Sequence, residues 1–171
     1  SIRDFNAVSQ MYVSDYGDPI LRADLINITT LPSPALSPDD LGWRLSMNQA
    51  DGEKVLSRAI TFDGVLFFTS FSPGSSATAC AAAPGENRLY AIDLLTGDPL
   101  LNRDESEDTE ELTETDRYTL LKQGSIAPQV EILFGQDNPT VGTLLVGPET
   151  PDADIITSLP ARSYWTQDGA E

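Results

Sequence analysis

The sequence contains no histidine and a single cysteine, Cys80, among its 171 residues. Without histidine the chain can supply neither a histidine general base nor a histidine-ligated zinc site. A lone cysteine cannot form a disulfide within the chain, so Cys80 is free, pairs with a missing part of the parent protein, or pairs between chains. Because Cys80 lies among alanines with Arg88 as the nearest cation in sequence, the pattern also argues against a cysteine nucleophile.

Basic residues are scarce as well. Ten Lys and Arg against 27 Asp and Glu give a net charge of −17, which repels phosphate backbones and anionic lipid surfaces. The composition therefore predicts no nucleic-acid partner. No run approaches the roughly 18 apolar residues of a membrane-spanning helix, and no signal peptide is recognisable, so we expect no membrane span.

Acidic residues concentrate in residues 104–116, where eight of thirteen positions are Asp or Glu. Such a block repels itself and cannot bury a core, which predicts a solvated or disordered excursion. A calcium site is the alternative, but the block lacks the Asp-x-Asp/Asn-x-Asp/Asn-Gly spacing that arranges oxygen ligands around calcium. We therefore expect no metal site in this chain.

Apolar alternation is clearest between residues 55 and 97. It predicts three strands, at residues 60–62, 65–71 and 88–93, each bounded by turn residues. The second of these is apolar on both faces, so we expect it to be covered on both sides, as a middle strand in a stack of sheets would be.

Two turns in this stretch have a physical signature. Asp63-Gly64 supplies the positive φ values of a two-residue type I′ hairpin turn. Asp93 can accept hydrogen bonds from the backbone amides around Thr96 while Gly97 takes the left-handed conformation. This turn chemistry favours a structural role for Asp93 and Thr96 over a catalytic one.

Weaker patterns predict further strands at residues 8–16, 24–29, 42–47, 124–134, 143–146 and 161–165. Residues 20–28 also fit helical spacing. In the predicted strand 124–134 the candidates for inward-facing side chains are Ile126, Val130, Ile132 and Phe134. Trp43 is most simply a core residue, with an exposed aromatic platform for a ligand as the alternative. The small-residue loop 72–87 is either a binding loop or a plain connection, and the sequence leaves both open.

The order of strand, Asp-Gly turn, aromatic strand, loop and Leu-Tyr-Ala-Ile-Asp-Leu-Leu-Thr-Gly resembles one blade of a quinoprotein-type β-propeller. A longer series is similar in order to the C-terminal region of the PilY1-like proteins, which are type IV pilus tip-associated adhesins and assembly factors. This series consists of Gly42-Trp-Arg-Leu, Gly52-Glu-Lys-Val-Leu-Ser-Arg, Phe67-Phe-Thr-Ser-Phe-Ser-Pro, Cys80, Gly124-Ser-Ile-Ala-Pro and Arg162-Ser-Tyr-Trp.

The resemblance implies an all-β fold, a partial β-propeller of about two to three antiparallel four-stranded blades of the quinoprotein or WD40-like type. Residues 1–171 would form one C-terminal propeller fragment, with approximate blades at 1–47, 48–123 and 124–171 and an acidic insertion at 102–117. A complete propeller needs at least four blades of about 40 to 50 residues. We therefore expect a fragment of a longer protein, and the start at Ser1 without an initiator methionine fits this expectation.

The implied function is non-catalytic: a pilus biogenesis and adhesion module exported to the cell surface, the pilus tip, or the outer membrane or periplasm of a Gram-negative bacterium. Its partners would be pilins, minor pilins or a host surface, together with the rest of the parent propeller. The family has a calcium loop in its propeller that finds no counterpart here, so calcium would bind outside this chain. We expect no catalytic, cofactor-binding or metal-binding residues.

Two alternatives remain. One is a fragment of a quinone (PQQ)-dependent dehydrogenase, an enzyme family with the same blade signature. The tryptophan-rich docking motif, calcium site and catalytic aspartate that characterise those enzymes do not accompany Asp93. The other is a structural propeller of an unrelated surface protein, which a blade pattern alone does not distinguish.

Overall fold

The computed structural model describes residues 20–32, 35–37, 39–74, 84–100, 112–134 and 142–151. Within these ranges the chain is mostly β-structure, with two short 3-10 helices, η1 (Arg22–Asp24) and η2 (Glu114–Arg117). The larger sheets are antiparallel and none closes into a barrel, which agrees with the predicted all-β class. Cys80 and the predicted strands 8–16 and 161–165 lie outside the described residues.

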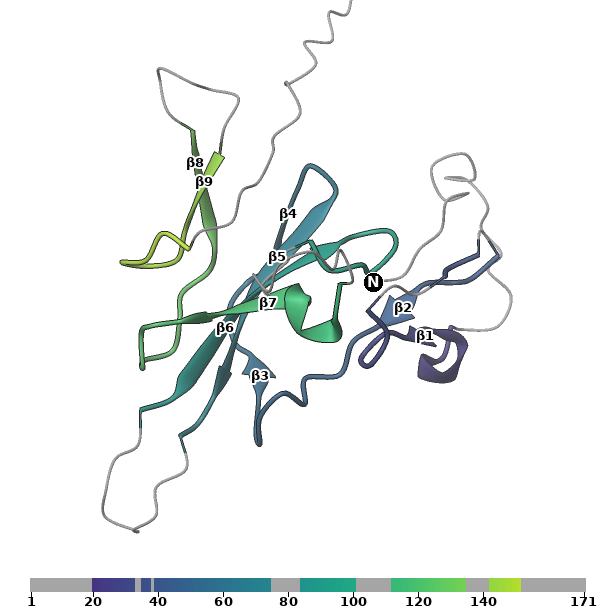
Figure 1. The fold of residues 1–171 in the computed structure, drawn as a ribbon, viewed down its shortest axis with the longest axis horizontal. Coiled ribbons are helices and arrows are strands. Elements are labelled where there is room, and N and C mark those ends of the chain that lie inside the picture. The colour runs from purple at the N-terminus through teal and green to yellow at the C-terminus, as the bar shows by residue number, and fades with distance from the viewer. Residues whose placement is uncertain are drawn as a thin grey trace, which may run out of the picture.

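A five-stranded antiparallel sheet lies in the middle of the molecule (Figure 1). Strands β3 and β4 both pair with one edge of β5, β6 pairs along its other edge, and β7 closes the far side. Strands β3 and β4 therefore run in the same direction along one edge of β5, and from β4 to β7 the chain reverses direction at each strand, in sequence order. The strands are β3 (Lys54–Val55), β4 (Ile60–Phe62), β5 (Val65–Ser72), β6 (Glu86–Asp93) and β7 (Tyr118–Leu121).

The three strands predicted with the clearest pattern are confirmed as β4, β5 and β6, and their turns have the expected geometry. Asp63 and Gly64 have φ values of 48° and 78°, both positive as a type I′ turn requires. Asp93 Oδ1 accepts hydrogen bonds from the amides of Leu95 (2.8 Å) and Thr96 (2.6 Å). Gly97 has φ 76°, and a Cβ there would lie 2.8 Å from Ile28 Cδ1, so only glycine fits.

Both faces of the central sheet are covered, as the apolar faces of the second predicted strand indicated. On one face Phe67, Leu89, Ala91 and Leu121 pack against the C-terminal part of the chain, through Ala127, Val130, Leu144 and Val146. On the other face Phe68, Tyr90 and Ile92 pack against the N-terminal part, through Ile28 and Trp43. The result is three layers with the five-stranded sheet as the middle one (Figure 1).

The N-terminal layer is less regular than predicted. Strand β1 covers only Ile26–Asn27 and β2 only Trp43–Arg44, and the two pair in parallel. The predicted strand 24–29 was too long at both ends, because η1 precedes Ile26 and the Asn27 side chain accepts hydrogen bonds from the amide and hydroxyl of Thr29, which turns the chain. Trp43 is 3% exposed, so the prediction of a core residue is confirmed and the exposed platform is wrong.

The C-terminal layer is a hairpin of β8 (Glu131–Phe134) and β9 (Gly142–Leu145). Val130 and Ile132 face the core as predicted, but Ile126 and Phe134 are 57% and 46% exposed, so their inward assignment was wrong. The cause lies in the loop before β8. Asn87 accepts a hydrogen bond from the Ala127 amide and donates one to Ser125 O, which directs Ala127 into the core.

Helix η2 corrects the interpretation of the C-terminal end of the acidic block, residues 114–116. Asp116 is 1% exposed and accepts hydrogen bonds from the amide (2.6 Å) and hydroxyl (2.9 Å) of Thr113. It therefore belongs to a capped turn that leads into β7 and not to a solvated excursion. Most of the block lies outside the described residues.

Candidate functional site

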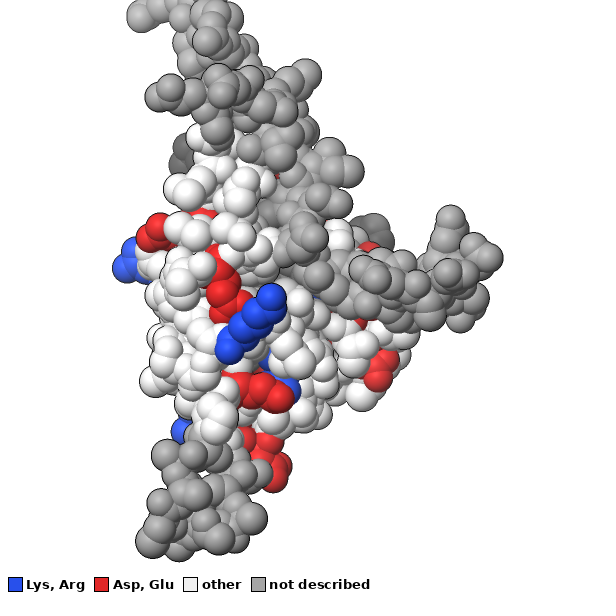
Figure 2. Space-filling view, turned by 60° about the vertical axis from the view of Figure 1, so that its left-hand side comes forward, with Lys and Arg blue, Asp and Glu red and all other residues white. Residues whose placement is uncertain are grey.

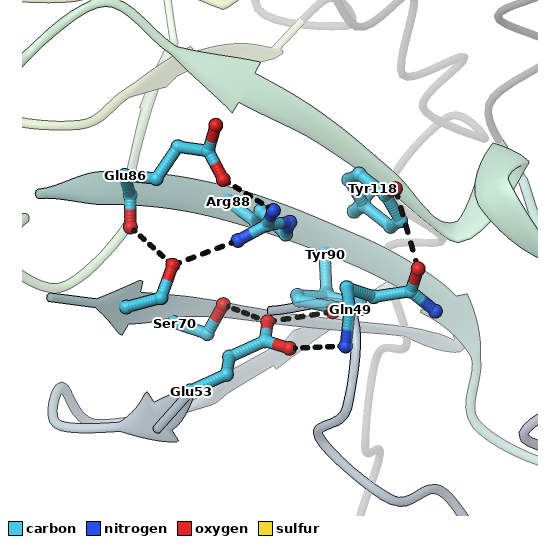
Figure 3. Close-up of polar contacts among 8 residues, drawn as sticks. Gln49, Glu53, Ser70, Glu86, Arg88, Tyr90 and Tyr118 are labelled. Carbon is cyan, nitrogen blue, oxygen red and sulfur yellow. Dashed lines mark hydrogen bonds and ion pairs between the residues drawn. The ribbon is translucent and has the colours of Figure 1, made fainter. Parts of the chain in front are cut away.

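A cluster of polar side chains lies between the loop before β3 and the strands β5 and β6 (Figure 3). Glu53, only 7% exposed, is its centre. Its Oε1 accepts hydrogen bonds from Ser70 Oγ (2.6 Å) and Tyr90 Oη (2.9 Å), and its Oε2 accepts one from the Gln49 amide (2.9 Å). A carboxylate only accepts hydrogen bonds, and here three donors surround it. The Glu53 carboxylate therefore has hydrogen-bond donors on both oxygens, and it joins the loop to strands β5 and β6.

Arg88 forms the neighbouring part of the cluster on β6. Its Nη2 lies 2.5 Å from Glu86 Oε2, and its Nη1 donates to Ser72 Oγ at 3.1 Å. The guanidinium stands over the Tyr118 ring at 5.4 Å from the centroid. Burial by itself lowers the pKa of Arg88, but the hydrogen bond to Glu86 and the nearby charge of Glu53 outweigh burial, so the pKa is raised. Arg88 thus carries a fixed positive charge beside the buried carboxylate.

Tyr90 connects this cluster to the aromatic core. Its ring stacks on Phe68 with centroids 4.7 Å apart and planes 6° apart, and it meets the Tyr118 ring at 5.4 Å. Burial raises the pKa of Tyr90 above its ordinary value of 10.0, and the Glu53 carboxylate raises it further. The folded chain therefore keeps the phenol proton to a higher pH than the unfolded chain does.

The raised pKa of Tyr90 predicts a loss of stability in alkali. Because the folded state binds this proton more tightly, its contribution is complete below the ordinary pKa of 10.0 and is lost as the pH rises above it. Urea unfolding between pH 8 and pH 11, at about half-unit steps, should show the free energy of unfolding of the natural chain falling more steeply than that of Tyr90→Phe. Tyr118→Phe, which removes a hydroxyl from the same cluster, should retain the steep fall because Tyr90 is still present. Equal slopes for the natural chain and Tyr90→Phe would contradict the prediction.

A second polar centre, Arg117 at the end of η2, is 1% exposed. Its Nε donates to Gly97 O at 2.9 Å, and its Nη2 donates to Leu31 O and to Pro32 O. Desolvation lowers its pKa, an effect that the nearby carboxylates of Asp98 and Glu114 partly offset. Arg117 therefore joins its own segment to those of Gly97 and of Leu31 and Pro32 from inside the molecule.

An open cleft of about 450 Å³ lies along the outer strand β7, lined by residues 119–122 and 148–151. Glu149 closes one end of it, since its two carboxylate oxygens accept hydrogen bonds from the amides of Lys122 and Gln123, each at 2.8 Å.

On the face shown in Figure 2 acidic side chains run down the surface with basic ones scattered among them, over broad uncharged areas. The cleft is lined by backbone groups, by the exposed apolar side chain of Leu120 and by the charged residues Lys122 and Glu149.

Sequence reasoning named no catalytic, cofactor or metal residue, and it missed the two polar centres. Within the described ranges no three His, Cys, Asp or Glu side chains are placed to hold a metal ion. Glu53 was considered only as part of the motif Gly52-Glu-Lys-Val-Leu-Ser-Arg, and Arg117 follows directly on the acidic block. The only signal in the sequence that could have pointed to these two residues is a charged side chain next to a strand. This signal recurs throughout the chain, so it does not distinguish a buried charge from an exposed one. Asp93 and Thr96 form the turn that was predicted for them.

Comparison of the chain with family models, curated proteins and solved structures finds no significant match. The resemblance to the PilY1-like proteins therefore stays a prediction. No helix among the described residues is long and apolar enough to cross a membrane.

Proposed function

We propose that this chain is a non-catalytic binding and assembly module, the C-terminal part of a type IV pilus tip protein of the PilY1-like kind. It would form a stack of propeller blades exported to the surface of a Gram-negative bacterium, where it contacts pilins, minor pilins or a host surface and the rest of its parent protein. Calcium, if the parent binds it, would bind elsewhere in the parent.

The observation that carries this proposal is the face-to-face stacking of three β-layers in chain order. Strands β3 to β7 follow one another across the middle sheet, strands β1 and β2 precede it on one face, and strands β8 and β9 follow it on the other. Successive propeller blades stack face to face in this way, and the middle sheet has the up-and-down antiparallel order of a blade from β4 to β7, whereas the β1–β2 pair is parallel. The ordered series of sequence motifs then favours the pilus proteins among the proteins that use such blades.

The experiment that tests the proposal is a chromosomal replacement in a piliated host that carries this gene. Phe67→Ala should abolish or sharply reduce surface pili and attachment, because Phe67 is fully buried between the middle and C-terminal layers and its truncation costs about 3–5 kcal/mol. Val55→Ala, also an apolar truncation but at a site 42% exposed, should leave both unchanged. Pili are counted by electron microscopy after immunoblots confirm that each parent protein is exported.

Normal pili and normal attachment in a strain from which residues 1–171 are deleted, with the truncated parent still exported, would contradict the proposal. The quinone-enzyme alternative has its own test. The chain's parent, reconstituted with calcium and pyrroloquinoline quinone, should not reduce an artificial dye with any of a panel of primary alcohols. Turnover above that of a boiled control would favour the dehydrogenase instead.

A further inference from the structure

Two Asp-Gly pairs lie among the described residues, Asp51-Gly52 and Asp63-Gly64, and all four residues are exposed. An Asp-Gly pair is open to a reaction of its own main chain, in which the glycine nitrogen attacks the carboxyl carbon of the aspartate side chain. Glycine has no Cβ to hinder this attack, and its backbone turns freely. The reaction still requires the peptide plane between the two residues to rotate. The structure therefore decides which pair reacts.

The Asp63-Gly64 pair is held on both sides. Phe62 and Val65, which flank it, pair with each other in the β4–β5 ladder, so strand pairing closes the turn. The Gly64 carbonyl also accepts a hydrogen bond from the Leu94 amide at 2.8 Å. Rotation of this peptide plane requires these contacts to open, and the local opening of a paired hairpin costs free energy. The folded sheet therefore protects Asp63-Gly64 from the reaction.

The Asp51-Gly52 pair lies in residues 45–53, which connect β2 to β3 and contain no strand. A hydrogen bond from the Glu53 amide to Ala50 O, 3.2 Å long, closes the turn around it. Gly52 has φ 73° at the third position of this turn, which is typical of type II. Turns of types I and II share the closing bond and differ in the orientation of the central peptide plane. The plane between Asp51 and Gly52 can therefore rotate while the turn stays closed.

We propose that Asp51 is a site of spontaneous covalent modification, at which the main chain changes from the aspartyl to the isoaspartyl form through a succinimide ring. The Gly52 nitrogen bonds to Asp51 Cγ, and one carboxyl oxygen leaves as water with the amide proton and a proton from solvent. Water then attacks the backbone carbonyl carbon of Asp51 and breaks its bond to the Gly52 nitrogen, which returns one proton to the nitrogen and one to solvent. The chain now continues through Cγ, with no net change in mass. Attack of water at Cγ instead restores the aspartate.

The modification lengthens the main chain by one carbon atom just before Glu53. The Glu53 carboxylate accepts hydrogen bonds from the Gln49 amide and from the hydroxyl groups of Ser70 and Tyr90 (Figure 3). A longer turn changes the position from which Glu53 reaches these donors, so the isoaspartyl chain should be less stable. Modification at Asp51 thus connects the age of the protein to its buried polar cluster. This inference concerns the folded chain alone and does not depend on the pilus proposal.

The proposal is tested by ageing the full natural chain at neutral pH and body temperature for several weeks. Trypsin then releases Asp51 in peptide 45–54 and Asp63 in peptide 59–88, so the two pairs are measured separately. Liquid chromatography separates the aspartyl and isoaspartyl peptides, and electron-transfer fragmentation in the mass spectrometer identifies them. The isoaspartyl form should be at least about tenfold more abundant at position 51 than at position 63, because the paired hairpin opens less often. In the guanidinium-unfolded chain the two pairs should react at similar rates.

Asp51→Glu is the matched control. It keeps the negative charge at an exposed position, but its longer side chain would have to close a larger ring, so peptide 45–54 should remain unmodified. Ageing in heavy-oxygen water should add one labelled oxygen to each isoaspartyl peptide, because the ring is opened by solvent water. The isoaspartyl form of the natural chain, isolated by ion exchange, should unfold at a lower urea concentration than aged Asp51→Glu.

Four results would overturn the inference. Equal amounts of isoaspartate at positions 51 and 63 of the folded chain would show that the strand pairing does not decide the site. Absence of isoaspartate at position 51 of the folded chain, when the unfolded chain forms it, would show that the turn does not allow the rotation. Isoaspartate without the oxygen label would exclude the succinimide route. An isoaspartyl chain as stable as aged Asp51→Glu would exclude the connection to Glu53.

Discussion

Replacing Arg117 by methionine is expected to lower the free energy of unfolding by about 3 kcal/mol. The methionine keeps most of the apolar volume but leaves the carbonyls of Gly97, Leu31 and Pro32 without their donor inside the molecule. Hydrogen bonds from a charged donor each contribute about 1.5–3 kcal/mol to stability. The methionine variant no longer has to bury a charged guanidinium, and this saving in desolvation free energy offsets part of the loss. Urea unfolding followed by tryptophan fluorescence measures the change, since Trp43 lies in the adjoining core.

Arg22→Met is the matched control for this replacement. Arg22 is exposed and makes a single hydrogen bond to Ser46 Oγ at 3.2 Å, so its replacement should change the free energy by less than about 0.5 kcal/mol. Arg117→Lys should fall between the two, because a lysine keeps the charge but cannot reach carbonyls on several segments with a planar fork of donors. Equal unfolding curves for Arg117→Met and Arg22→Met would show that Arg117 does not hold these segments together.

Replacing Glu53 by alanine is expected to destabilise the fold by a similar amount, about 3 kcal/mol. The change leaves Ser70 Oγ, Tyr90 Oη and the Gln49 amide without an acceptor in a site that is nearly closed to water. Unsatisfied buried donors cost about 1–3 kcal/mol each, and some relaxation towards solvent reduces the sum. Glu53→Gln should lose about half as much, because the two hydroxyl groups can rotate to accept from its amide while the backbone amide keeps an acceptor.

Glu86→Ala is the control for Glu53. Glu86 also carries a carboxylate near Arg88, but its side chain is 53% exposed, and exposed ion pairs contribute only about 0–1 kcal/mol. A double-mutant cycle of Glu53→Ala with Tyr90→Phe should show a coupling energy of about 1 kcal/mol or more, since the two side chains are in direct contact. A loss for Glu53→Ala no larger than that for Glu86→Ala would contradict the central position of Glu53.

The aromatic and turn residues of the middle sheet illustrate how far the sequence alone was informative. Strands β4, β5 and β6 are joined by the Asp63-Gly64 turn and one loop, so alternation and turn chemistry sufficed to predict them. Strand β7 escaped prediction, because residues 94–117 separate it from its partner β6 and its four residues carry no distinctive alternation. Long-range pairing depends on where the intervening chain places the strand, and no local pattern encodes this position.

The candidate site was still less predictable. Glu53 and Arg117 resemble ordinary surface charges in the sequence, and their burial follows only from the strands and loops that surround them. Likewise, Ile126 is more apolar than Ala127, yet Ala127 is buried and Ile126 is exposed. The amide of Ala127 is held by the side chain of Asn87, a residue forty positions earlier, and this contact decides which side chain faces the core.

By itself the sequence determined the strand-rich class, the Asp63-Gly64 and Asp93 to Gly97 turns, the two-sided burial of β5, and the exclusion of histidine chemistry. These features depend on neighbours in the chain, through backbone conformation, alternation and composition. Only the tertiary structure decided the parallel pairing of β1 with β2, the closing strand β7, the buried positions of Glu53 and Arg117, and the open cleft beside Leu120. These features depend on contacts between distant segments, whose geometry exists only when all three layers are packed together.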